Sequence, residues 1–93
     1  GRVVNKSLNF TIDEKKVTDL KGRLLKPPLT FFNKKIREII TLDGYKFILE
    51  DKSSVLFRQS GTENYFRVYI EANTGETLEK LSHYTTLFAN GEL

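Results

Sequence analysis

The chain of 93 residues is short enough for one domain, and 39% of its residues are hydrophobic, including seven Phe and four Tyr. Such a composition can bury a hydrophobic core, so general disorder is not expected. There is no cysteine, which excludes disulfides, thiolate catalysis and cysteine-ligated zinc. No apolar run approaches membrane-spanning length, so we expect a cytoplasmic domain without a membrane partner. The chain starts at Gly1 and has no Met, and we interpret it as an excised piece.

The net charge of +3 is unevenly distributed along the chain. Residues 1–40 contain ten Lys and Arg against four Asp and Glu, whereas residues 41–93 contain five against eight. A basic segment can bind nucleic acid, but these basic residues are scattered, which is typical of a solvated surface or a face packed near other domains. We therefore do not expect a nucleic-acid partner.

A helix is predicted near the start of the chain, after residues 1–10, which have no clear hydrophobic period and are interpreted as a linker or hinge. Thr11 and Glu14 have the spacing of a capping box. Apolar residues then recur at helical intervals, at Val17, Leu20 and Leu24. The helix is expected over residues 12–25, with a proline pair ending it.

Residues 29–35 are interpreted as a connection whose Phe31 and Phe32 tuck under a sheet. Apolar, β-rich runs then follow in hairpin succession and predict four strands, over residues 36–42, 45–50, 53–58 and 65–71. Asp43-Gly44, between the first two, is the strongest hairpin signal in the chain.

Alternation in the fourth predicted strand places side chains on two opposite faces. The core side is expected to carry Phe66, Val68 and Ile70, and the other side Tyr65, Arg67 and Tyr69. Thr74 is a plausible N-cap of a final helix that stops at Asn90-Gly91. The fold class predicted is α+β: a four-stranded antiparallel sheet with helices packed on one face, in a single domain over residues 1–93.

The connection between the third and fourth predicted strands has the chemistry of an anion-binding loop. Gly61 permits positive φ and close approach of a ligand, while Ser60 and Thr62 add hydroxyl donors. Arg58 brings a planar, permanently charged fork that suits two phosphate oxygens. The pattern favours an oxyanion, phosphate in particular. The structural alternative is an ordinary polar turn in which Arg58 pairs with a carboxylate such as Glu63.

The pattern Arg-x-Ser-Gly-Thr-Glu, then three residues, then Arg-Val-Tyr-x-Glu-Ala over residues 58–72 resembles the phosphate-binding segment in the last domain of the α-D-phosphohexomutases. This family includes phosphoglucomutases and phosphomannomutases. The likeness extends more loosely back to residues 43–47 and forward into the final helix. It implies a fold of the TATA-binding-protein type, and a phosphate held by Arg58, Ser60, Gly61 and Thr62 that is not the one transferred.

The resemblance also implies a longer parent enzyme that moves a phosphoryl group between the 1 and 6 positions of a hexose phosphate, with a phosphoserine and magnesium. Neither lies in this chain, so we expect the isolated chain to be inactive, with a sugar phosphate and the parent's other domains as partners. Glu63 and Arg67 are assigned supporting roles, Arg67 pairing with Glu71 or Glu50. The alternative function is a free-standing basic module that binds nucleic acid or protein.

No cofactor or metal site is expected within the chain. His83 is the only histidine, and it has no cysteine or ordered pair of carboxylates nearby in the pattern. We interpret it as a surface residue of the final helix. Asp43, Glu50 and Asp51 lack the spacing of a calcium loop.

Overall fold

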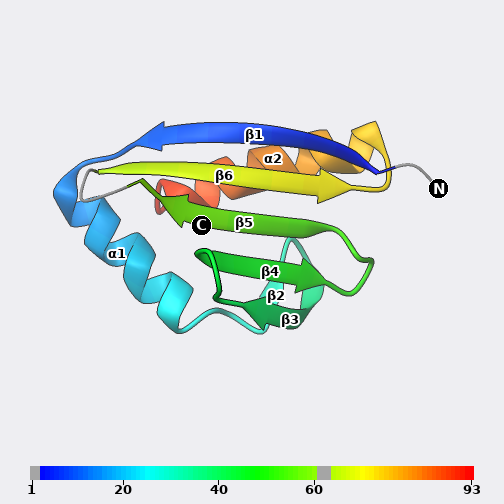
Figure 1. Ribbon diagram of the computed structural model, residues 1–93, viewed down its shortest axis with the longest axis horizontal. Helices are drawn as coiled ribbons and strands as arrows, with labels where there is room; N and C mark the ends of the chain where they lie inside the picture. Colours follow the sequence, from blue (N-terminus) through cyan, green and yellow to red (C-terminus); the bar gives the residue numbers. More distant parts are fainter. Residues whose placement is uncertain (1–2, 61–63) are drawn as a thin grey trace.

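A single antiparallel sheet organises the protein (Figure 1). The computed structural model describes residues 3–60 and 64–93. Its elements follow in the order β1 (Val4–Thr11), α1 (Glu14–Leu25), β2 (Thr30–Phe31), β3 (Lys34–Ile40), β4 (Tyr45–Leu49), β5 (Ser54–Gln59), β6 (Tyr65–Ala72) and α2 (Gly75–Ala89). The predicted α+β class is confirmed, because two helices and six strands form the described part of the chain.

The strand order in the sheet is β1-β6-β5-β4-β3-β2, and each neighbouring pair is antiparallel. After β1, the chain crosses through α1 to the opposite edge of the sheet and then returns strand by strand until β6 lies beside β1 (Figure 1). The β1–β6 ladder runs in register from Val4↔Ala72 to Thr11↔Tyr65. The start of the described chain is therefore paired with a strand whose residues lie about sixty positions later in the sequence.

The prediction of four strands was wrong, since the sheet has six. Residues 1–10 were expected to be a linker or hinge, but Val4–Thr11 form β1. Its side chains do alternate between half-buried and exposed, yet Lys6 interrupts the apolar face and leaves no clear period. The partner strand is distant in sequence, so the pairing that stabilises β1 has no local signal.

The second missed strand is β2, which has only two residues. It pairs with β3 through a turn at Phe32 and Asn33, whose φ angles are +55° and +58°. Two consecutive positive φ angles are typical of a two-residue hairpin turn, where Asn-Gly is the usual sequence signal. Because Phe32 occupies the first turn position, the sequence lacks the usual signal for this hairpin.

Both helices begin at a capping side chain, although the first cap differs from the prediction. The side chain of Asp13 caps α1 by accepting a hydrogen bond from the Lys16 amide at 2.8 Å. Thr11 is instead the last residue of β1, so the predicted capping box does not form. In α2 the predicted cap is confirmed, because the Thr74 side chain accepts from the Thr77 amide at 3.1 Å.

One hydrophobic core joins the inner face of the sheet to both helices. The predicted inward-facing residues of β6 are confirmed, since Phe66, Val68 and Ile70 are all buried. Buried apolar side chains from α1 and α2 complete the same cluster. Both helices therefore pack on one face, as predicted, and the other face of β5 and β6 remains available for a site.

Phe31 lies at the centre of an aromatic cluster within this core and is fully buried. Its ring contacts four others edge-on, at centroid distances of 4.7 to 6.4 Å: those of Phe47, Phe57, Tyr84 and Phe88. Edge-to-face geometry is favourable because the positive ring edge meets the negative face of its neighbour. The predicted tucking of Phe31 under the sheet is thus confirmed, while Phe32 is only half-buried.

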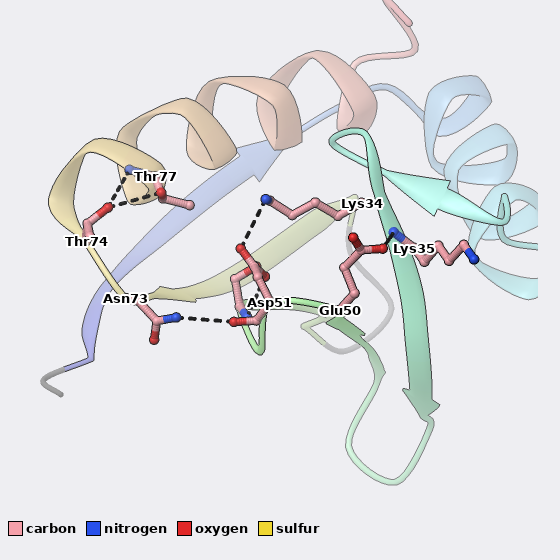
Figure 2. A network of polar contacts seen from close by, with 8 residues as sticks. Lys34, Lys35, Glu50, Asp51, Asn73, Thr74 and Thr77 are labelled. Carbon is pink, nitrogen blue, oxygen red and sulfur yellow. Dashed lines mark hydrogen bonds and ion pairs between the residues drawn. The ribbon is translucent and has the colours of Figure 1, made fainter.

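A polar network holds the turn between β4 and β5 (Figure 2). Asp51 accepts hydrogen bonds from the amide and hydroxyl of Ser53, and its carboxylate lies 3.3 Å from the Lys34 ammonium. The Asn73 side chain donates to the Asp51 carbonyl at 3.2 Å. Burial raises the pKa of Asp51, but the hydrogen bonds from Ser53 and the charge of Lys34 outweigh it and lower that pKa below its ordinary value. This network lies at the opposite end of β5 from Arg58.

Candidate functional site

The candidate anion-binding loop connects β5 to β6, as predicted. β5 ends at Gln59 and β6 begins at Tyr65. Gly61, Thr62 and Glu63 lie outside the described residues, so their proposed roles stay predictions. Arg58 is exposed near the end of β5, and Ser60 is exposed directly after it.

Two backbone hydrogen bonds fix the base of this loop. The Ser60 amide donates to the Tyr65 carbonyl at 3.0 Å, and the Ile12 amide donates to the Asn64 carbonyl at 3.0 Å. The second bond ties the loop to the segment between β1 and α1. Because the Ser60 amide is already used, its hydroxyl is the group that Ser60 can offer to a ligand.

Arg58 and Arg67 are directly opposite each other in the register of β5 and β6. Partners in an antiparallel pair share a face, and this is the outer face that the helices do not cover. The predicted placement of Arg67 opposite the core is confirmed by its exposure. Within the described part of the chain, neither guanidinium forms an ion pair.

Arg67 is held by polar side chains of β1 and β6. Its Nε donates to Asn9 Oδ1 at 3.3 Å, and the Tyr65 hydroxyl donates to the same oxygen at 2.7 Å. Hydrogen bonds with Tyr69 and, secondly, Tyr65 raise the pKa of Arg67 above its ordinary value. Among the described residues Arg67 forms no ion pair with Glu71 or Glu50, so that predicted pairing was wrong. The Glu50 carboxylate accepts from the Lys35 amide at 2.7 Å instead (Figure 2).

A polar hollow of about 320 Å³ opens between the two arginines and is lined by Arg58, Gln59, Ser60, Arg67 and Tyr69. Two permanently charged guanidinium groups, a serine hydroxyl and a phenol make the hollow rich in hydrogen-bond donors. Arginine forks match the oxygens of phosphate or carboxylate. The described geometry is therefore suited to an oxyanion on the outer face at the end of β5.

Asn9 is the site residue that the sequence did not reveal. It belongs to β1, which was interpreted as a linker, and it reaches Arg67 only because β1 pairs with β6. A partial signal does exist, because the polar residues Asn5, Ser7 and Asn9 alternate with a face that is apolar except at Lys6. Such period-2 alternation is typical of a half-buried strand with one polar face.

No group of three or more metal-ligating side chains comes together within residues 3–60 and 64–93. His83 is exposed on α2, where it lines, together with Tyr84, a different and mostly apolar hollow. In the same described ranges, neither helix is long and apolar enough to cross a membrane.

Comparison of the sequence with known proteins shows the family to which the chain belongs. Residues 3–86 match the family described as phosphoglucomutase/phosphomannomutase, C-terminal domain. A probable phosphoglucosamine mutase of Methanosphaera stadtmanae is 42% identical over 55 residues, which are 59% of this chain and 12% of that protein. A phosphopentomutase of Thermococcus kodakarensis is 41% identical over 46 residues, which are 50% of this chain and 10% of that protein.

The aligned part of the chain thus spans only about a tenth of the length of these relatives. The family match, by contrast, covers nearly all of the chain, including β1, both arginines and the loop between them. The chain therefore belongs to the family of phosphoglucomutase/phosphomannomutase C-terminal domains.

Proposed function

We propose that this chain is the substrate-phosphate-binding domain of a larger phosphohexomutase-type enzyme, which interconverts hexose 1-phosphate and 6-phosphate by phosphotransfer. Arg58, Ser60, Gly61 and Thr62 hold the phosphate that is not transferred, and Glu63 and Arg67 support them. The observation that carries the proposal is the pair of facing arginines beside the Ser60 hydroxyl in one polar hollow. The family membership supports it, and so do the names of both relatives, a probable phosphoglucosamine mutase and a phosphopentomutase, which describe mutases of phosphorylated sugars.

The proposed role is positioning. A phosphate clamped by Arg58 and its neighbours anchors one end of the sugar, so that binding energy far from the reacting centre orients the other end. Such anchoring commonly accompanies closure of one domain over a cleft and exclusion of water. The sugar itself is read elsewhere in the longer enzyme, so this chain does not select the hexose.

A magnesium ion of the parent enzyme would neutralise charge on the phosphoryl group that moves. The described residues of this chain offer no cluster of carboxylates or histidines to hold it. We therefore propose that the metal and the phosphoserine belong to other parts of the longer protein and that the isolated chain is inactive.

Affinity of the isolated chain for phosphate is expected to be weak. Charge-assisted hydrogen bonds contribute about 1.5–3 kcal/mol each, and association costs at least about 4 kcal/mol. A few such bonds leave a dissociation constant on the order of millimolar.

Steady-state kinetics of the full-length protein with Arg58→Ala test the function. Loss of the bidentate contact should lower kcat/KM by about tenfold to a hundredfold, as expected for one or two charge-assisted bonds. Arg37→Ala is the matched control, because Arg37 is also exposed but lies on β3, away from the polar hollow. If kcat/KM of the Arg58→Ala variant equals that of the Arg37→Ala variant, the domain serves only for packing and the proposed phosphate clamp is wrong.

A further inference from the structure

The turn between β3 and β4 lies against the strand end that carries Arg58. Gly44 in this turn has a φ of +136°. A Cβ added to it would lie 2.4 Å from the carbonyl oxygen of Phe57, 3.3 Å from the carbonyl carbon of Phe57 and 3.4 Å from the Cα of Arg58. All three are backbone atoms, so none can rotate away. Only glycine fits this position without a shift of the main chain.

The β4–β5 ladder explains why this contact concerns the site. Tyr45 pairs with Phe57, so Gly44, one residue earlier, lies beside Arg58, one residue later. The turn also borders a second hollow of about 460 Å³, to which α1 contributes Lys21 and Leu25. Arg58 lines both this hollow and the polar one, and therefore forms part of the wall between them.

We propose that Gly44 is a positioning residue for Arg58. Close packing of the Asp43-Gly44 turn against the backbone of Phe57 and Arg58 holds the end of β5 and sets the direction in which the Arg58 guanidinium leaves the strand. The inference rests on the proposed function, because it assumes that Arg58 is a phosphate ligand. A side chain at position 44 displaces either the turn or the strand end, and a displacement of about 1 Å at a ligand is enough to weaken an oriented contact.

Gly91 provides the matched control for this proposal. It also has a positive φ, of +73°, so an alanine there strains the backbone as well. Gly91 follows α2, and a Cβ added to it would lie 3.7 Å from Asp19 Oδ2 and 4.0 Å from Arg23 Nη2, both at side-chain ends. Gly91→Ala therefore adds backbone strain without contacting β5.

The test measures the affinity of the 93-residue chain for inorganic phosphate by amide NMR titration, together with unfolding in urea. The variants are Gly44→Ala, Gly91→Ala and Arg58→Ala. All are made in a Gly22→Ala background, because Gly22 has open space around its Cα within α1 and alanine there should stabilise the helix. The more stable background offsets part of the cost of Gly44→Ala, and the urea unfolding checks that each variant is folded before its affinity is measured.

Gly44→Ala should weaken phosphate binding about threefold to tenfold, a part of the loss expected when a charge-assisted bond is removed. It should also shift the Arg58 side-chain Nε–H resonance of the ligand-free chain. Gly91→Ala should lower the urea midpoint while leaving both the affinity and that resonance unchanged.

Equal phosphate affinity of Gly44→Ala and Gly91→Ala would overturn the positioning role of Gly44. The proposed function would survive that result, provided that Arg58→Ala still loses affinity. If Arg58→Ala binds phosphate as well as the background chain does, both the positioning role and the phosphate clamp are wrong.

Discussion

Arg58 on β5 and Arg67 on β6 lie directly opposite each other, exposed on the face of the sheet that the helices leave uncovered. Like charges at directly opposed positions of a sheet destabilise the fold, by up to about 1 kcal/mol. Asn9 holds Arg67 in place, because its Oδ1 accepts hydrogen bonds from both Arg67 Nε and the Tyr65 hydroxyl. A bound oxyanion would attract both guanidinium groups and so offset the repulsion between them. Binding at the site should therefore stabilise the fold.

Phosphate should stabilise the chain against heat. At a phosphate concentration about tenfold above a millimolar dissociation constant, the gain is about 1.4 kcal/mol, or roughly 5–10 °C for a domain of this size. Thermal unfolding followed by circular dichroism measures it. Arg58→Ala should abolish the rise, whereas Arg37→Ala should retain it; an equal rise in both variants would indicate a general salt effect instead of a site.

Replacing Arg67 with a neutral residue should lower the affinity for phosphate without changing the free energy of unfolding. Arg67→Gln removes the charge facing Arg58 but keeps a polar chain that can still donate to Asn9. The free energy of unfolding should stay within about 0.5 kcal/mol of wild type, because the residue is exposed. Phosphate affinity should fall about threefold to tenfold and be partly restored in Arg67→Lys. Urea unfolding and NMR titration distinguish this result from a purely structural role, in which stability alone would change.

Asp51 should make the stability of the chain depend on pH in the acid range. Its pKa is lowered in the folded state, so its contribution is fully present above the unfolded value, near 3.8, and is lost as the pH falls through the lower folded value. Asp51→Asn should lower the free energy of unfolding at pH 7 by about 1 kcal/mol. Urea midpoints between pH 2 and pH 7 should converge with those of wild type at the acid end. A constant difference over the whole range would contradict the assignment.

Phe31 should be the most sensitive core position outside β5 and β6. Phe31→Ala removes a fully buried ring that contacts four other aromatic rings, and should cost about 3–5 kcal/mol. Phe31→Leu keeps most of the volume and should cost clearly less. Urea unfolding of both variants measures the difference; equal costs would mean that the edge-on ring contacts contribute little.

The sequence was sufficient to predict the elements whose signals are local. The Asp43-Gly44 turn, the alternation of Phe66, Val68 and Ile70, and the Thr74 cap are each encoded within a few neighbouring residues. For the same reason, the position of Arg58 at the end of a strand could be predicted. Gly61, Thr62 and Glu63 stay predictions, because they lie outside the described residues.

What the sequence did not reveal depends on contacts between distant segments. β1 was interpreted as a linker because its partner β6 lies about sixty residues away, and the contact of Asn9 with Arg67 was hidden with it. The close approach of Gly44 to Phe57 requires the register of β4 on β5. The β2–β3 hairpin was missed because Phe32 adopts a conformation that its residue type does not suggest.

Amide NMR titration of the ¹⁵N-labelled chain with inorganic phosphate tests the central claim most directly. We predict that the largest shift changes come from residues 58–63 and from the facing Arg67, that they saturate with a dissociation constant on the order of millimolar, and that Arg58→Ala removes them. If the signals of residues 58–63 stay still, or if the shifts map to the Asp51 end of the sheet, the chain does not hold a substrate phosphate in this loop.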